Sequence, residues 1–293
     1  MIHKLGIVGA GTMGAGIAAV AARAGLTVVL YDPFPETLPR AAERIRAEWK
    51  KSGPAGAATT DDLDATLSRI TFSPSMEVLS SADAVVEAAS EDLTVKSDLF
   101  RSLDRMIPPP AILATNTSSL SITTLGTVVA NPGRVIGMHF FNPPARMDLV
   151  EIVRGRSTSP STVEATVALA VVMNKTPVVC RDTPGFIVNR IARPFYGEAL
   201  RLLGEGVAPL ERIDDIVTRS GGFAMGPFAL MDLIGIDINY AVTLSVYEQF
   251  FHEPRFRPHP IQRQMVEAGT LGRKTGRGFY DYTPTPGKEP DRR

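Results

Sequence analysis

The chain has 293 residues, and its content of 44% hydrophobic and 21% charged residues fits a soluble globular protein. Its 31 basic and 31 acidic residues cancel, which excludes a global positive field that would attract nucleic acid or an anionic membrane. The single cysteine, Cys180, excludes an intrachain disulfide and favours a reducing compartment, so we expect a cytoplasmic protein. A chain of this length favours two domains.

The N-terminal segment MIHKLGIVGAGTMGAGIAAVAARAG is apolar, but it lacks the basic start of a signal peptide and has glycines in its middle. We interpret it as a strand, a turn and a helix. No run of 18 apolar residues occurs in the sequence, so we predict no membrane-spanning segment.

Strand-like runs alternate with helical patterns as far as Cys180, and this rhythm predicts a parallel sheet with helices on both faces. After Thr183 the strand signals stop. We therefore predict an α/β domain over 1–183 and an all-helical domain over 184–293. The predicted strands are Lys4–Val8, Thr27–Tyr31, Ile70–Phe72, Ala84–Glu87, Ala111–Thr115, Val135–Phe140, Leu149–Val153 and Pro177–Cys180. The predicted helices of the second domain are 185–206, 209–220, 228–250 and 258–269.

A long helical stretch over 39–68 exceeds what one strand–helix–strand unit needs. Two helices broken at Ser52-Gly53-Pro54 would explain it, so we predict a helical hairpin inserted into the first domain. A solvated surface hairpin is one interpretation, and its basic residues leave a binding role open.

Residues 9–14, GAGTMG, match the G-x-G-x-x-G pattern of dinucleotide-binding turns, between a strand-like run and a small-residue helix. Gly9 permits the turn, Gly11 permits close approach of a pyrophosphate, and Gly14 permits tight helix packing. Asp32 ends the second predicted strand, where a carboxylate holds the adenosine ribose and repels a 2′-phosphate. We therefore predict a Rossmann-type domain that binds NAD rather than NADP. The alternative is a tight turn that only packs a helix on the sheet.

His139 lies in an apolar strand and Glu151 at a comparable depth in the next. A histidine in this setting is often an ordinary core residue. However, a carboxylate bonded to one ring nitrogen leaves the other free as a base. The predicted strand also ends at the edge where open α/β sheets bind ligands. We therefore predict a base and its orienting partner.

The motifs HFFNPP, LVEIV, NTSSL, DTPGFIVNR, MGPF and GRKTGRGFYDY, in that set, resemble the L-3-hydroxyacyl-CoA dehydrogenase family, including its 3-hydroxybutyryl-CoA members. The resemblance covers Lys4 to Tyr282. It implies NAD-dependent interconversion of L-3-hydroxyacyl-CoA and 3-oxoacyl-CoA, a step of fatty acid β-oxidation. The catalytic residues that it implies are His139 as base, Glu151 as its orienting partner, Ser118 near the substrate hydroxyl and nicotinamide, and Asn189 at the thioester carbonyl.

The resemblance also implies further contacts with NAD and coenzyme A. The expected cofactor-binding residues are Gly9, Gly11, Thr12, Met13, Gly14, Asp32, Glu91, Lys96, Asn116, Ser118, Asn142 and Lys274. Lys51 and Ser118 are the expected coenzyme A contacts, and no metal site is expected. Structural alternatives remain: Ser118 as a helix cap, Asn189 as a polar helix residue, and Glu91 with Lys96 as a helix start carrying a solvated lysine.

Two other functions stay open: a dehydrogenase of a free hydroxy acid or sugar acid resembling gulonate dehydrogenases, and a non-catalytic dinucleotide-binding protein. The acyl chain is also open, because the segment MDLIGIDINYAVTLSVYEQFF resembles members that act on dicarboxylic acyl-CoA. Both 3-hydroxybutyryl-CoA and 3-hydroxyadipyl-CoA are candidate substrates. The apolar stretch over 222–236 predicts a homodimer formed through the second domain.

Overall fold

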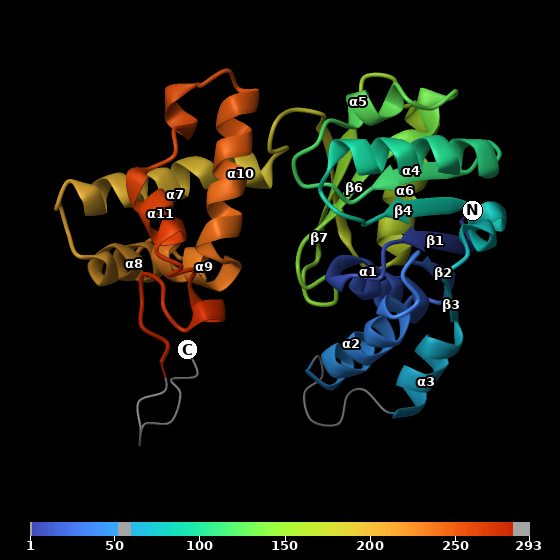
Figure 1. Ribbon diagram of the computed structural model, residues 1–293, viewed down its shortest axis with the longest axis horizontal. Coiled ribbons are helices and arrows are strands. Elements are labelled where there is room, and N and C mark those ends of the chain that lie inside the picture. Colours follow the sequence, from blue (N-terminus) through green and yellow to red (C-terminus); the bar gives the residue numbers. More distant parts are fainter. Residues whose placement is uncertain (1, 52–59, 284–293) are drawn as a thin grey trace. The chain divides into compact units, whose positions relative to one another are not determined.

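The computed structural model describes residues 2–51 and 60–283 (Figure 1). The chain divides into two compact units between Phe186 and Ile187. The first unit carries the sheet and the second is mainly helical, so the predicted fold class is confirmed. The expected break of the helical hairpin and the side chain of Lys51 lie outside the described residues.

The first unit is built on one sheet of eight strands in the order β3-β2-β1-β4-β5-β6-β7-β8. Strands β1 to β6 are all parallel, whereas β7 runs antiparallel to β6 and parallel to β8. The reversal has a local cause, because the link over 141–148 is shorter than a parallel crossover requires. The strands are β1 (Lys4–Val8), β2 (Thr27–Tyr31), β3 (Ile70–Ser73), β4 (Ala84–Glu87), β5 (Ile112–Thr115), β6 (Val135–Phe140), β7 (Leu149–Arg154) and β8 (Thr176–Arg181).

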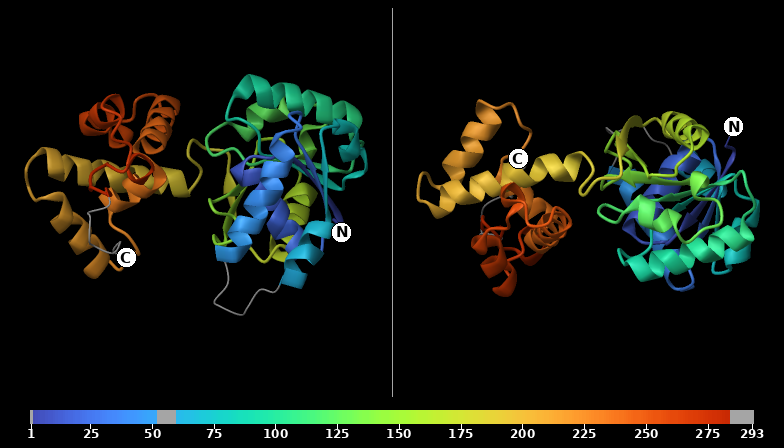
Figure 2. Two further views of the ribbon diagram at one scale, coloured as in Figure 1. Left: turned by 60° about the horizontal axis from the view of Figure 1, so that its bottom comes forward. Right: turned by 90° about the horizontal axis from the view of Figure 1, so that it is seen from above.

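Alternate side chains of the strands supply two separate cores. Leu5 and Ile7 of β1 pack on one face with helices α1, α2, α3 and α6, whereas Val8 faces α4 and α5 on the other. Figure 2 shows α6 and α4 on opposite sides of the sheet. The helices are α1 (Thr12–Arg23), α2 (Thr37–Lys51), α3 (Thr60–Ser68), α4 (Leu93–Met106), α5 (Ile122–Gly126) and α6 (Pro160–Val172). The inner strands β4, β5 and β6 are covered on both faces and are mainly apolar, whereas the edge strand β8 is largely exposed.

The second unit packs five helices around Phe228, Met231 and Leu200. They are α7 (Val188–Gly204), α8 (Leu210–Arg219), α9 (Pro227–Ile234), α10 (Ile236–Gln249) and α11 (Pro260–Glu267). The predicted single helix over 228–250 is wrong: α9 and α10 meet at a bend of 100°. Gly235 causes the break, since its φ of 102° lies outside the range of a right-handed helix.

The C-terminal motif GRKTGRGFYDY contains one short 3-10 helix, Arg273–Thr275, and is otherwise not helical, so the second unit is mostly rather than wholly helical. Two isolated β-bridges join Gly272 to Arg277 and Arg277 to Asp281. The buried carboxylate of Asp232 accepts hydrogen bonds from the backbone N–H groups of Phe279 and Tyr280, each at 2.9 Å. This aspartate therefore holds the motif against α9.

In the part of the chain that the structure describes, no single helix is long and apolar enough to cross a membrane. Only α9 and α10 taken together, with the bend between them, reach that length and composition.

Candidate active site

The glycine turn over 9–14 joins β1 to α1. Gly9 has a φ of 99° and donates its N–H to the carbonyl of Tyr31 at 2.8 Å. A side chain at Gly14 would overlap the carbonyl oxygen of Gly9, so the helix can pack this closely only with glycine there. At Gly11, by contrast, no atom lies within 4 Å of the position that a side chain would take.

The N-terminus of α1 suits an anion. Gly11 is its N-cap, and no side chain caps the helix there. Uncapped N–H groups at a helix N-terminus attract phosphate, and the space beside Gly11 allows close approach. These features fit the pyrophosphate of a dinucleotide. Thr12 is exposed and opens the helix, whereas Met13 packs partly against the core.

Asp32 follows β2 and supports the turn directly. Its Oδ2 accepts the N–H of Ala10 at 2.7 Å, and its Oδ1 accepts the N–H of Phe34 at 3.0 Å. Arg44 of α2 reaches the same turn and donates to the carbonyl of Ala10 at 3.3 Å. The carboxylate is therefore a structural element of the turn as well as a candidate ribose ligand, and the contact from Arg44 was not predicted.

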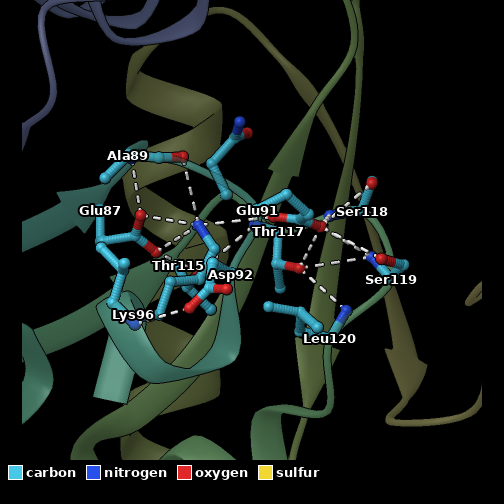
Figure 3. Close-up of polar contacts among 12 residues, drawn as sticks. Glu87, Ala89, Glu91, Asp92, Lys96, Thr115, Thr117, Ser118, Ser119 and Leu120 are labelled. Atoms are coloured by element: carbon cyan, nitrogen blue, oxygen red, sulfur yellow. Dashed lines mark hydrogen bonds and ion pairs between the residues drawn. The ribbon is translucent and has the colours of Figure 1, made fainter. Parts of the chain in front are cut away.

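Glu87, Lys96 and Glu91 form a charge network at the carboxyl edge of the sheet, in which Glu87 and Lys96 are buried and Glu91 is exposed (Figure 3). Lys96 donates to both carboxylate oxygens of Glu87, at 2.7 and 2.9 Å, and its Nζ lies 3.4 Å from Glu91. Glu87 is fully buried and also accepts the hydroxyl of Thr115 at 2.6 Å. Lys96 is 1% exposed, so it is not the solvated lysine of the structural alternative.

Glu91 connects this network to the loop after β5 (Figure 3). Its Oε1 accepts the hydroxyl of Thr117 at 2.6 Å, and it accepts both the N–H and the hydroxyl of Ser118, at 2.8 and 3.2 Å. Lys96 and these donors hold the pKa of Glu91 below its usual range against the opposing effect of burial. An ionised Glu91 therefore fixes the position of Ser118. The capping alternative for Ser118 is wrong for α5, whose N-cap is Ser121.

His139 and Glu151 stand directly opposite each other in the β6–β7 pair. The ring Nδ1 of His139 lies 2.7 Å from Oε2 of Glu151, and the two residues are 6% and 1% exposed. Phe141 and Phe186 contact the imidazole, with ring centroids 4.6 and 5.8 Å away. The pair holds Nδ1 as a donor, and within the described residues Nε2 makes no hydrogen bond. Nε2 is therefore available to exchange a proton.

Asn116 links these two parts of the edge. Its N–H bonds to the carbonyl of Glu87 at 2.7 Å, and its Oδ1 accepts the N–H of Phe140 at 2.8 Å. Its side chain thereby fixes the end of β6 beside His139. Asn142, in the loop after β6, lines a cavity together with Thr12.

That cavity has a volume of about 270 Å³ and adjoins a second one of about 320 Å³. Both lie between α1, α2 and the loop over 142–148, and we call them together the α1–α2 groove. The residues shared by both cavities are Ala19, Ile45, Glu48 and Ala145.

Two of the expected site residues belong to the second unit. Asn189 is in the first turn of α7, and its backbone carbonyl accepts the Nε–H of Arg193 at 3.1 Å. Lys274 pairs with Asp237 at 2.5 and 2.7 Å, an interaction that the motif did not indicate. The first unit brings together His139 with Glu151, and Ser118 with Glu91 and Lys96.

Sequence reasoning missed Glu87, the buried partner of Lys96. It was predicted only as the last residue of a strand. One sequence pattern could have revealed it: Glu87 is an acid at the carboxyl end of an apolar strand next to the switch point of the sheet, and a lysine follows in the next helix. Among the described residues, no group of three or more His, Cys, Asp or Glu side chains is arranged to hold a metal.

Cys180 behaves as a packing residue. Burial, with the charges of Glu151 and Asp182, raises the pKa of its thiol to about 12. The reactive thiolate is therefore scarce at neutral pH.

Comparison with known proteins identifies the relatives of both units. The family model described as "3-hydroxyacyl-CoA dehydrogenase, NAD binding domain" matches residues 4–183, and "3-hydroxyacyl-CoA dehydrogenase, C-terminal domain" matches 185–282. A 3-hydroxyadipyl-CoA dehydrogenase of Escherichia coli is 47% identical over 96% of this chain, which spans 59% of that relative's length.

Two further relatives match over nearly their full length. A probable 3-hydroxybutyryl-CoA dehydrogenase of Bacillus subtilis is 42% identical, with 96% of this chain and 98% of the relative covered. The crystal structure of an (S)-3-hydroxybutyryl-CoA dehydrogenase from Ralstonia eutropha is 41% identical with a TM-score of 0.92, covering 97% of this chain and 100% of that one.

The glycine turn predicts a contrast between two substitutions. Gly14→Ala should destabilise the fold by about 2 kcal/mol, because the new methyl group overlaps the backbone of the turn. Gly11→Ala should leave the free energy of unfolding within about 0.5 kcal/mol of wild type but raise the Kd for NAD. Urea unfolding and NAD titration measure both. An unchanged Kd in Gly11→Ala would remove the turn from the pyrophosphate site.

The charge network predicts a second contrast. Glu87→Gln should lower the free energy of unfolding by about 3 kcal/mol, because it leaves the Lys96 ammonium buried without its nearest counter-charge. Asp98→Asn removes an exposed partner of Arg101 on the same helix and should cost less than about 1 kcal/mol. Adding Lys96→Met to Glu87→Gln should recover part of the loss. Equal costs for Glu87→Gln and Asp98→Asn would contradict this account.

Proposed function

The chain belongs to the 3-hydroxyacyl-CoA dehydrogenase family, and on that premise we propose how its residues carry out the reaction. It is accordingly an NAD-dependent oxidoreductase that interconverts a 3-hydroxyacyl-CoA and the 3-oxoacyl-CoA. We propose His139 as the base that removes the proton of the 3-hydroxyl group. The observation that carries the assignment is the 2.7 Å contact between Nδ1 and Glu151, which directs Nε2 to the reaction.

The buried pair of His139 and Glu151 accounts for the transfer of the 3-hydroxyl proton. NAD, when bound, supplies the acceptor for the hydride that leaves C3. As the hydroxyl ionises, Nε2 takes its proton and the ring becomes an imidazolium. Glu151 stabilises that cation at short range in a site with little water. In the reverse direction the imidazolium returns the proton to the 3-oxo group.

Ser118 and Asn116 prepare the reacting end of the site. We propose that Ser118 contacts the substrate hydroxyl and the nicotinamide. The Ser118 hydroxyl donates to Glu91 at 3.2 Å, so the ionised carboxylate sets its orientation at the edge of the sheet. We assign Asn189 to the thioester carbonyl, and Asn142 and Lys274 to the cofactor. These three assignments rest on the family motifs.

We propose Asp32 as the ligand of the adenosine ribose. The oxygens that hold the N–H groups of Ala10 and Phe34 each keep acceptor capacity for a hydroxyl. The negative charge of Asp32 disfavours the 2′-phosphate of NADP.

We further propose that the α1–α2 groove holds part of coenzyme A. The groove is lined along α2 by Ile45, Glu48 and Trp49, and α2 continues to Lys51, the expected contact for a phosphate. The relatives named above act on 3-hydroxybutyryl-CoA or 3-hydroxyadipyl-CoA, and both remain candidate substrates.

The proposed reaction predicts that the enzyme prefers a coenzyme A thioester to a free acid. Wild-type protein should oxidise NADH with acetoacetyl-CoA much faster than with free acetoacetate, which separates a thioester enzyme from one acting on free acids.

His139→Gln should lower kcat roughly a hundredfold or more with the Kd for NAD nearly unchanged. A kcat close to wild type would remove His139 from the mechanism.

Glu151→Gln is the companion test of the pair. The amide no longer stabilises the imidazolium, so kcat should fall and the pH profile of kcat/KM should move. A lower kcat with an unmoved profile would make Glu151 a structural residue only.

We also infer a homodimer formed through the second unit. Phe223, Leu233 and Ile234 are 54%, 50% and 38% exposed within the apolar stretch 222–236. Light scattering at micromolar concentration should give about twice the mass of one chain. A monomer at that concentration would refute the dimer.

A further inference from the structure

Arg193 is a buried cation of the second unit that is bonded only to neutral groups. It is 4% exposed. Its Nη1 donates to the carbonyl of Asn239 and to the hydroxyl of Thr243, both at 2.9 Å, and its guanidinium lies over the ring of Tyr196. Within residues 2–51 and 60–283, no carboxylate forms an ion pair with it.

This arrangement is costly for the fold. Burial lowers the pKa of Arg193 to about 10, because the charged form has lost its hydration. A buried charge is normally paired. In the first unit Arg134 follows that rule, since it is 3% exposed and lies 2.8 Å from the carboxylate of Asp104, whereas the buried Lys175 donates to the backbone carbonyls of Pro144 and Met147.

Arg193 and its hydrogen-bond partner Asn239 each have a side-chain donor without an acceptor among the described residues. The Nη2 group of Arg193 bonds to no acceptor in the described chain. The side-chain Nδ2 of Asn239 is buried and has no partner, while its Oδ1 accepts from Gln262 at 2.8 Å. Asn239 is joined to Arg193 by the hydrogen bond from Nη1. A positive charge with donors left over is the chemistry that recognises a carboxylate.

The position of Arg193 along α7 matches a substrate chain. Asn189 and Arg193 are four residues apart, so they lie on one face of the helix about one turn, or roughly 6 Å, apart. An extended chain of carbon–carbon bonds of about 1.5 Å spans that distance between the thioester carbonyl and the last carbon of an adipyl group.

We propose that Arg193, assisted by Asn239, binds a carboxylate at the far end of the acyl chain, so that the preferred substrates are 3-hydroxyacyl-CoA thioesters of dicarboxylic acids. The inference rests on the proposed function, in which Asn189 holds the thioester carbonyl. The ω-carboxylate supplies the counter-charge that the fold does not provide. A neutral methyl end leaves the guanidinium unpaired.

A purely structural role for Arg193 makes a different prediction. Its bonds to Asn189, Asn239 and Thr243 also brace α7 against α10. Loss of a brace would affect all substrates alike, whereas loss of a carboxylate site affects only those that carry the carboxylate.

The test compares 3-hydroxyadipyl-CoA with 3-hydroxyhexanoyl-CoA, which have equal chain lengths and differ only at the far end. Wild type should favour the adipyl substrate in kcat/KM by roughly tenfold or more, the factor for a charge-assisted hydrogen bond. Arg193→Met should abolish this preference and retain activity on the hexanoyl substrate. Arg193→Lys keeps the charge without the planar fork, so its preference should be intermediate. Arg201→Met, at an exposed position on the same helix, should match wild type.

The outcomes separate the two proposals. If wild type turns over both substrates equally, the carboxylate site is overturned and the dehydrogenase function stands. If wild type turns over neither, the proposed function itself fails. Equal losses with both substrates in Arg193→Met and in Arg193→Lys would assign Arg193 to bracing and overturn the inference.

Discussion

The contact between His139 and Glu151 depends on the antiparallel register of β6 and β7. That pairing sets His139 directly opposite Glu151, and both side chains then point to the same face. A slip of one residue would turn Glu151 to the other face of the sheet. Buried neighbours on both strands resist such a slip, since Met138 and Ile152 pack in one core and Val135 and Val153 in the other. The hydrophobic pattern of two strands therefore determines the geometry of the pair to which we assign the proton transfer.

At the same edge of the sheet, ion pairs fix the positions of Glu87, Lys96 and Glu91. Glu87 and Glu91 share the single ammonium group of Lys96, so the network retains a negative charge on Glu91 at its outer end. Ser118 takes its orientation from that charge, since Glu91 accepts both its N–H and its hydroxyl. The sheet core thus controls a loop residue through two ion pairs, which explains why a position as remote as Glu87 belongs to the site.

The sequence predicted most of this fold because its strands are continuous apolar runs and its glycine turn has a characteristic spacing. The pair His139 and Glu151 was found because two polar residues stand out in such runs. Glu87 did not stand out, since an acid at the end of a strand is common and its partner follows in a separate helix. The break at Gly235 was missed because apolar residues continue on both sides of it, and only the backbone angle reveals it.

We propose that different buried charged groups of this chain serve the reaction and the choice of acyl substrate. Three buried groups of the first unit have a charged partner within the fold: His139 has Glu151, Lys96 has Glu87, and Arg134 has Asp104. The buried Lys175 donates instead to the carbonyls of Pro144 and Met147. Arg193 in the second unit is also buried and bonded to neutral groups, and the proposed ω-carboxylate would supply its counter-charge. If Arg193 binds the ω-carboxylate as proposed, a residue of the second unit selects the substrate, whereas the proposed proton transfer uses His139 and Glu151 of the first.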